Sequence, residues 1–156
     1  MLCLVVVDDN PVEIYLLKEA LQQVSAEFTL HTFQSGDTAS RYFRSAVQNH
    51  PAKRPHIILL DINLPGKSGL ELLDQIKNDE RLRTIPVIMV STSANPRDVQ
   101  QAYASHASCY LVKRMDADAH IDALQRLLTF WSLTARLPKQ VHAPVPAASI
   151  GTVDSS

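Results

Sequence analysis

Acidic, hydroxyl and ammonium side chains come directly after short apolar runs at four places in this sequence. They are Asp8 and Asp9, Asp61, Ser91 and Lys113. Carboxylates that lie close together repel one another and cannot all ionise unless a cation joins them. Oxygen ligands without Cys or His favour Mg²⁺ or Ca²⁺, and a shallow site with few protein ligands favours Mg²⁺.

Ser91 and Lys113 would complete a set of groups that suits phosphoryl transfer onto Asp61. A lysine binds phosphate as a point charge, and a serine hydroxyl can donate a hydrogen bond to it. Positioning and charge stabilisation do most of the catalysis in such a reaction. Taken singly, an Asp after a strand is usually a turn or N-cap residue, and a lone Lys is usually a solvated surface group. The joint pattern is what indicates a functional acidic site.

Strands and helices that could position these groups alternate along the chain. Wholly apolar runs bounded by turn residues predict buried strands. The predicted strands span residues 2–7, 28–33, 57–60, 87–90 and 108–112, and the predicted helices start at Pro11, Asp37, Ser68, Pro96 and Asp116. Asn10 is a good N-cap, and Pro11 fits the first helical position.

This alternation predicts an α/β fold, a doubly wound parallel sheet of five strands covered on both faces. In such a sheet every carboxyl end lies at the same edge, and ligands bind at the point where the strand order reverses. A strand order of 2-1-3-4-5 would make the strand before Asp8 the neighbour of the strand before Asp61. Three carboxylates would then meet at one edge.

Size and composition indicate one globular domain with an ordinary core. A formal net charge of −1 gives no electrostatic footprint for nucleic acid or membrane. No apolar stretch is long enough to span a bilayer, and the first residues lack the features of a signal peptide. Cys3 and Cys109 are expected to be buried thiols in a reducing cytoplasm. Residues 1–131 are expected to form the domain, and residues 132–156, which become rich in Pro, Ala and Ser, a C-terminal extension.

The chain resembles the receiver domain of two-component response regulators, which has a flavodoxin-like fold. The motifs that carry the resemblance are Val-Val-Asp8-Asp9-Asn10, Leu-Leu-Asp61-Ile-Asn63-Leu-Pro65-Gly66, Val-Ser91-Thr-Ser93 and Tyr110-Leu-Val-Lys113. Together they cover nearly all of the predicted domain. The resemblance implies that Asp61 accepts a phosphoryl group from a phosphohistidine on a sensor histidine kinase.

The resemblance also implies roles for the neighbouring residues. Asp9, Asp61 and the backbone carbonyl of Asn63 would bind Mg²⁺ directly, and Asp8 would bind it through water. Ser91 and Lys113 would contact the phosphoryl group, and Tyr110 would be a switch residue whose side chain follows Ser91. Asn63 and Ser93 occupy positions that tune the rate of dephosphorylation in the family.

Arg114 departs from the family pattern, because receivers usually follow the lysine with a proline in a cis peptide bond. A cis bond before a residue other than proline costs about 3–4 kcal/mol. The sequence leaves two alternatives: the site carries that cost, or the bond is trans and the loop of Lys113 lies differently.

The last predicted helix is more apolar than one core-facing stripe requires. Leu127, Phe130, Trp131 and Leu137 are candidates for a dimer interface, with the C-terminal extension as an arm over the partner. The alternative is that Trp131 caps the core of its own domain. The segment from Phe130 to Pro138 resembles single-domain regulators associated with bacterial phytochromes, which commonly dimerise through this helix.

Two functions from different classes fit these residues. The first is a single-domain response regulator that signals by a change of conformation and catalyses only its own phosphorylation and dephosphorylation. The resemblance implies a phytochrome-type kinase as its partner. The second is an Mg²⁺-dependent phosphohydrolase that forms an aspartyl phosphate. Such enzymes usually carry a general acid two residues after the nucleophile, where this chain has Asn63. A scaffold without phosphorylation would be expected to lack the acids or the lysine.

Overall fold

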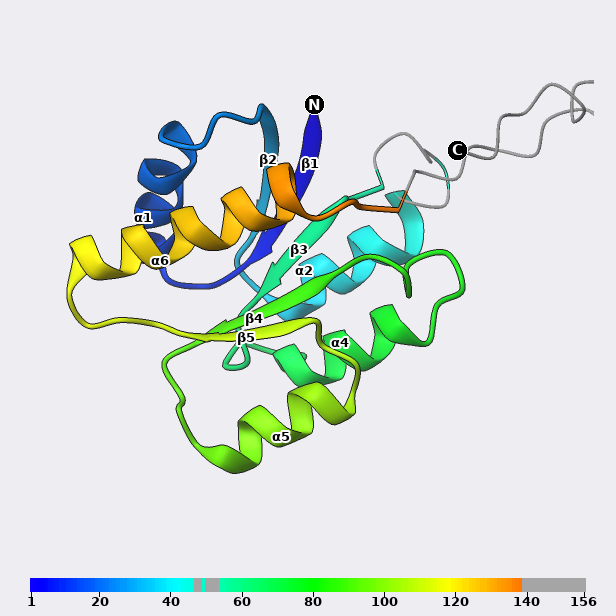
Figure 1. The fold of residues 1–156 in the computed structure, drawn as a ribbon. Coiled ribbons are helices and arrows are strands. Elements are labelled where there is room, and N and C mark those ends of the chain that lie inside the picture. The colour runs from blue at the N-terminus through cyan, green and yellow to red at the C-terminus, as the bar shows by residue number, and fades with distance from the viewer. Residues whose placement is uncertain (47–48, 50–53, 139–156) are drawn as a thin grey trace, which may run out of the picture.

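The computed structural model describes residues 1–46, 49 and 54–138. Five parallel strands form one sheet in the order β2-β1-β3-β4-β5, as predicted (Figure 1). Their bounds are β1 Leu2–Val7, β2 Phe28–Phe33, β3 Ile57–Leu60, β4 Val87–Ser91 and β5 Cys109–Val112. The central strands β1, β3 and β4 are almost entirely buried, which explains why they read as unbroken apolar runs.

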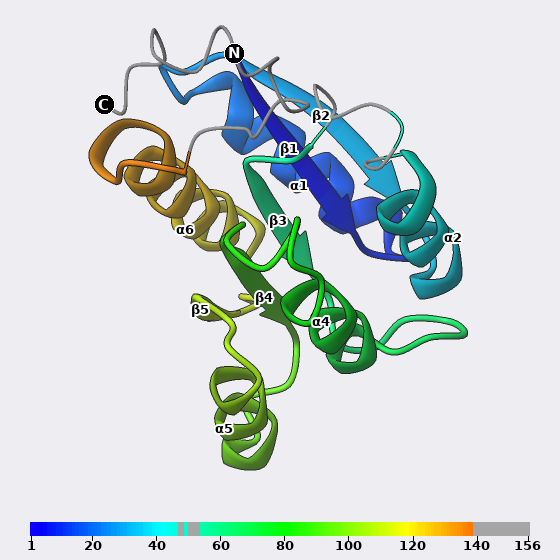
Figure 2. The ribbon, with the colours of Figure 1, turned by 90° about the vertical axis from the view of Figure 1, so that its right-hand side faces the viewer.

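Helices cover both faces of the sheet (Figure 2). Their bounds are α1 Pro11–Gln22, α2 Gly36–Arg41, α4 Gly69–Lys77, α5 Pro96–Ala104 and α6 Ala117–Thr129. Because side chains alternate along a strand, each strand feeds two cores. Leu4, Val6 and Leu59 pack with residues of α1 and α6. Val5, Val7 and their neighbours on that face pack with residues of α2, α4 and α5.

The pairing of β1 with β3 brings the first and third strand ends together. Val7, the last residue of β1, lies opposite Leu60, the last residue of β3. The Asp61 amide then donates to the Val7 carbonyl at 3.0 Å, which extends the ladder by one bond. Asp8 and Asp61 are therefore held side by side by main-chain hydrogen bonds.

Polar residues cap the N-termini of the first and last helices, at the positions where the sequence predicts that these helices begin. Asn10 caps α1, with its side chain accepting from the Val12 amide at 3.0 Å, and Pro11 is the first helical residue. Asp116 caps α6 by accepting from the Ala119 amide at 2.9 Å. These two residues therefore serve as helix caps.

Two predicted helices end in a different geometry from the one expected. The helix predicted to start at Asp37 continues as a π-helix at Tyr42–Ala46, and the last helix continues as one at Phe130–Thr134. Each π segment contains a serine whose hydroxyl donates to the carbonyl four residues earlier, Ser45 to Arg41 and Ser132 to Leu128. Such bonds compete with the α-helical ladder and loosen it locally. The expected C-terminal extension lies outside the described residues from 139 onward.

Two further features concern the described residues only. No helix among them is both long and apolar enough to cross a membrane. Cys3 is buried and Cys109 is half-buried, and both are free thiols.

Candidate functional site

Three carboxylates gather at the carboxyl edge of the sheet. Asp8 and Asp9 come from the end of β1 and Asp61 from the end of β3, and each offers an oxygen within 4.8 Å of the others. Asp8 is 3% exposed and Asp61 6% exposed, whereas Asp9 faces solvent. The site therefore has a buried floor and one acid at its mouth.

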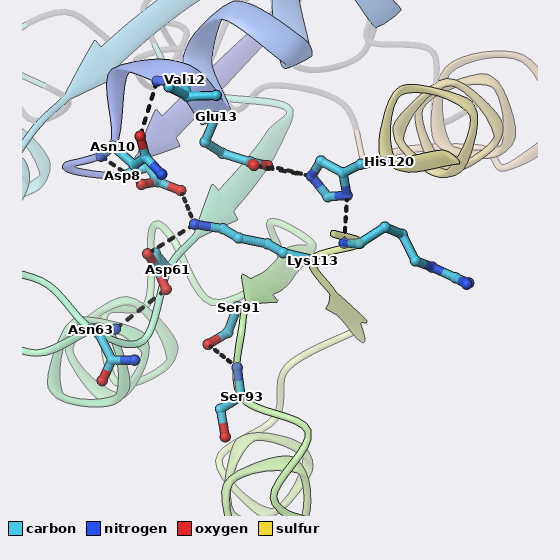
Figure 3. A network of polar contacts seen from close by, with 11 residues as sticks. Asp8, Asn10, Val12, Glu13, Asp61, Asn63, Ser91, Ser93, Lys113 and His120 are labelled. Atoms are coloured by element: carbon cyan, nitrogen blue, oxygen red, sulfur yellow. Dashed lines mark hydrogen bonds and ion pairs between the residues drawn. The ribbon is translucent and has the colours of Figure 1, made fainter. Parts of the chain in front are cut away.

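Lys113 joins the two buried acids from the end of β5 (Figure 3). Its Nζ lies 2.8 Å from Asp8 Oδ2 and 3.2 Å from Asp61 Oδ2. Burial acts to lower the pKa of Lys113, but the hydrogen bond and charge of Asp8, with the charges of Asp61 and Glu13, outweigh it and raise that pKa. Lys113 is therefore a charged ammonium group at neutral pH.

Asp8 shows the cost of gathering acids in a buried place. Burial raises the pKa of its carboxyl, and the charge of Asp61 adds to this. The hydrogen bond and charge of Lys113, and the Asn10 amide that donates to Asp8 Oδ1 at 2.9 Å, act in the opposite direction without cancelling the rise. An additional positive charge would relieve the remaining repulsion.

The Lys113–Arg114 peptide bond is trans. The Lys113 amide donates to the Ser91 carbonyl at 2.7 Å, so the strand pairing of β5 with β4 continues up to the lysine. Lys113 nevertheless reaches both buried acids. Of the two alternatives that the sequence left open, the structure shows the trans bond with the ammonium group inside the site.

Ser91 and Ser93, the two hydroxyl residues of the predicted site, lie at the end of β4 and just after it. Because β3 lies between β1 and β4, they are on the side of Asp61 opposite to Asp8. Ser91 is fully buried, and its Oγ accepts from the Ser93 amide at 3.2 Å. The Ser93 hydroxyl donates to Asp98 at 2.6 Å, and its side chain points away from Asp61 (Figure 3). Tyr110 donates its hydroxyl to the Ser93 carbonyl at 2.8 Å, which ties β5 to the loop after β4.

Asn63 lies in the loop that follows Asp61. Its backbone amide donates to Asp61 Oδ1 at 3.3 Å, and this hydrogen bond orients the carboxylate. The opposite oxygen, Oδ2, faces Lys113. One oxygen of Asp61 is thus held by the main chain, while the other pairs with the ammonium group of Lys113.

The donor set fits a hard divalent cation. Its atoms are carboxylate oxygens, with neither thiolate nor imidazole among them. A cation bound there would also lower the pKa of Asp8, because it would supply positive charge that stabilises the ionised carboxylate. Asp8, Asp9 and Asp61 are therefore the residues that could hold such an ion.

Glu13 and His120 form a buried polar pair beside this site that sequence reasoning missed. The His120 Nε2 lies 2.8 and 3.0 Å from the two carboxylate oxygens of Glu13. They are separated by 107 residues and meet only because α1 and α6 lie side by side (Figure 1). Nothing in the spacing of either residue signals the pair.

The expected dimer residues lie at the end of α6 and just beyond it. Leu127, Trp131 and Leu137 pack partly against the core of their own domain. Phe130 is 49% exposed and lies edge-on to Trp131, with ring centroids 5.3 Å apart. The buried Trp131 Nε1 has no hydrogen-bond acceptor among the described residues.

Comparison with known proteins places the chain in a family. Residues 4–125 match the response regulator receiver domain. Response regulator Rcp1 of Synechocystis sp. is 33% identical over 135 residues, which cover 86% of this chain and 92% of Rcp1.

Two solved structures share both the fold and much of the sequence. The Mn²⁺-bound form of Rcp1 is 33% identical, with a TM-score of 0.83, and the match covers 89% of this chain and all of that one. The phosphorylated cyanobacterial phytochrome response regulator RcpA is 36% identical with a TM-score of 0.83, covering 88% of this chain and 99% of that one. This chain belongs to the response regulator receiver domain family.

Proposed function

We propose that this chain is a single-domain response regulator that accepts a phosphoryl group on Asp61. The observation that carries the proposal is the position of Asp61 between two further carboxylates and the ammonium group of Lys113. A receiver domain implies a histidine kinase as its partner. The chain is then a signalling module that catalyses only its own phosphorylation and dephosphorylation.

In the transfer step, a carboxylate oxygen of Asp61 forms a bond to the phosphorus of the kinase's phosphohistidine. The bond from phosphorus to the imidazole nitrogen breaks, and that nitrogen keeps the electron pair. Lys113 moves little, because its Nζ already lies 3.2 Å from Asp61 and can pair with a phosphoryl oxygen beyond it. The geometry thus supplies charge stabilisation where negative charge accumulates.

We propose Mg²⁺ as the ion of the site, held by Asp8, Asp9, Asp61 and the backbone carbonyl of Asn63. Its contribution when bound is to neutralise charge on the carboxylates and the transferred oxygens. The support is the oxygen-only donor set and the charge that the buried acids leave uncompensated. The Mn²⁺-bound form of Rcp1 supports a divalent ion in this family.

The hydroxyl residues supply the response to phosphorylation. Ser91 would turn to donate its hydroxyl to the phosphoryl group, which releases the bond from the Ser93 amide. Tyr110, now bonded to the Ser93 carbonyl, would change its side-chain position with that loop. Asn63 and Ser93 would set the dephosphorylation rate, Ser93 only after its hydroxyl leaves Asp98 and turns toward Asp61.

A phytochrome-type histidine kinase is the proposed partner, because RcpA is a phytochrome response regulator 36% identical to this chain. The proposed place of action is the cytoplasm, and the free thiols of Cys3 and Cys109 agree with a reducing compartment. An aspartyl-phosphate phosphohydrolase is not favoured, since Asn63 lacks an acidic proton at the position where such enzymes need one.

The domain is proposed to span residues 1–131 and to dimerise through Leu127, Phe130, Trp131 and Leu137, with residues 132–156 as an arm. The support is the exposed apolar side chains of Phe130 and Leu133 at the end of the last helix. Light scattering tests this proposal: the wild type should be dimeric and Phe130→Ala monomeric at micromolar concentration. Met115→Ala, at an exposed apolar residue before α6, is the control. A wild-type monomer contradicts the proposal.

Phosphorylation itself is tested with acetyl phosphate and Mg²⁺. Intact mass should show one added phosphoryl group on the wild type, and none on Asp61→Asn. The addition should disappear when EDTA replaces Mg²⁺. Equal labelling of Asp61→Asn, or an unlabelled wild type, contradicts the proposal, and sustained turnover of a phosphoester would favour the hydrolase instead.

A further inference from the structure

The buried pair of Glu13 and His120 has a third member, the backbone amide of Arg114. His120 is 1% exposed, and its two ring nitrogens both have partners. Nε2 contacts the Glu13 carboxylate at 2.8 Å, and Nδ1 accepts from the Arg114 amide at 3.2 Å (Figure 3). One imidazole therefore connects a side chain of α1 to the main chain between β5 and α6.

The direction of these hydrogen bonds defines the tautomer of His120. A backbone N–H can only donate, so Nδ1 must offer a lone pair to Arg114 and carries no proton. A carboxylate can only accept, so Nε2 must carry the proton that it shares with Glu13. These partners require a ring that donates from Nε2 and accepts at Nδ1.

The amide that His120 holds belongs to the residue directly after Lys113. Family members with proline at this place have no N–H there, and the ring restricts the backbone instead. In this chain Arg114 has a free backbone dihedral and an amide that needs an acceptor. The bond to Nδ1 satisfies that amide and restricts the same peptide.

We propose that His120, oriented by Glu13, is a positioning residue that holds the trans Lys113–Arg114 peptide so that Lys113 enters the acidic site. This proposal rests on the proposed function, because it assigns His120 a role in phosphorylation of Asp61. The need for such a hold is visible in the fold. Lys113 follows β5, an edge strand paired on one side only, and its own amide is fixed at the Ser91 carbonyl. Within the part of the chain that the structure describes, the hydrogen bond from the Arg114 amide to His120 is the contact that fixes the Lys113–Arg114 peptide.

Glu13 contributes beyond orienting the ring. It is buried, and its negative charge acts on Lys113 in the same sense as the charges of Asp8 and Asp61. Glu13 also lies in the first turn of α1, where a carboxylate is stabilised by the helix N-terminus.

The tautomer is the first test and needs no phosphorylation. Long-range ¹H–¹⁵N correlation of the histidine rings in the wild type at neutral pH should show His120 protonated on Nε2 alone. The Arg114 amide resonance should shift in Glu13→Ala, which frees the ring, and stay close to its wild-type position in Glu19→Gln, the control on the same helix. An Nδ1–H tautomer, or a doubly protonated ring, overturns the proposal.

The second test measures whether His120 acts through the Arg114 amide. Arg114→Ala keeps the N–H, and Arg114→Pro removes it. In the Arg114→Ala background, His120→Ala should slow labelling of Asp61 by acetyl phosphate about tenfold, the factor expected for one hydrogen bond that fixes a catalytic geometry. In the Arg114→Pro background, the same substitution should change the rate less than about twofold.

A conservative variant separates positioning from simple loss of packing. His120→Asn places an amide oxygen on the same Cγ that carries Nδ1, so it can accept from Arg114 and should recover part of the rate lost in His120→Ala. Calorimetry should show Mg²⁺ affinity unchanged in His120→Asn. If Arg114→Pro does not fold, this rescue and the tautomer decide the question.

These experiments distinguish failure of the role proposed for His120 from failure of the phosphoacceptor function of Asp61. Normal labelling of both wild type and His120→Ala overturns the role of His120 and leaves the phosphoacceptor function standing. An equal loss of rate in the Ala and Pro backgrounds also overturns it, because His120 would then act by another route. If acetyl phosphate does not label the wild type at Asp61, the proposed phosphoacceptor function itself is contradicted.

Discussion

Replacing Lys113 with Met should destabilise the ion-free protein more than any surface lysine substitution. The Lys113 side chain is 9% exposed, and its Nζ lies 2.8 and 3.2 Å from two carboxylates that are themselves buried. The substitution keeps a side chain of similar length and removes the ammonium group with its charge and its hydrogen-bond donors. The carboxylates of Asp8 and Asp61 then lose the positive charge that pairs with both of them.

Two limits bracket the size of the effect. Removing one partner of a buried ion pair typically costs about 3–5 kcal/mol. The protein can escape part of that cost by protonating an acid, and protonating a carboxyl with an ordinary pKa of 3.8 costs about 4.4 kcal/mol at pH 7. Because burial already raises the pKa of Asp8, the escape is cheaper than that. We expect a loss of about 3 kcal/mol in the free energy of unfolding.

Urea unfolding followed by circular dichroism in EDTA is the assay, with Lys18→Met as the control. Lys18 is exposed on α1, and its substitution should change the free energy by less than about 0.5 kcal/mol. Added Mg²⁺ should stabilise Lys113→Met more than the wild type, because the ion replaces the lost charge. If Lys113→Met is as stable as Lys18→Met in EDTA, the ion pairs do not compensate the acids and the reasoning is wrong.

Three further outcomes are expected. Burial raises the pKa of Asp8, so the folded state binds that proton more tightly than the unfolded chain, and this group's contribution to stability in EDTA falls as pH rises from about 3.8 through the folded pKa. Asp8→Asn should therefore unfold at a higher temperature than the wild type at pH 7 in EDTA and gain less from Mg²⁺. Gly69→Ala should cost about 1–3 kcal/mol in urea unfolding and slow Asp61 labelling, because the new Cβ would lie 1.9 Å from the Asp61 carbonyl oxygen; unaltered stability would contradict this contact. Burial raises the pKa of both Cys3 and Cys109, so iodoacetamide should label each far more slowly in the folded than in the urea-unfolded protein, and equal rates would refute their burial.

The strands and the acidic edge could be predicted from the sequence because they follow from local patterns. Unbroken apolar runs predicted β1, β3 and β4, whose residues are buried on both faces. The parallel arrangement then required that Asp8 and Asp61 meet at one edge, which they do. The prediction needed only the rule that the carboxyl ends of parallel strands share an edge.

Other features depend on contacts between distant elements and could not be predicted. The bond between Glu13 and His120 needs α1 and α6 to lie together at a particular depth. The hydrogen bond from the Arg114 amide to the same histidine was also not predicted, whereas the trans Lys113–Arg114 peptide was one of the two alternatives that the sequence left open. The π-helical ends of two helices coincide with hydrogen bonds from the Ser45 and Ser132 hydroxyls to the main chain, which the apolar period of the sequence does not reveal.

The most direct measurement is the location of the phosphoryl group. Borohydride reduces an acyl phosphate on aspartate to homoserine, which peptide mass mapping can locate. After treatment with acetyl phosphate and Mg²⁺, homoserine should occur at position 61 and at neither Asp8 nor Asp9. Reduction at one of those two residues, or a phosphoryl group that borohydride does not remove, would contradict the assignment of Asp61 as the phosphoacceptor.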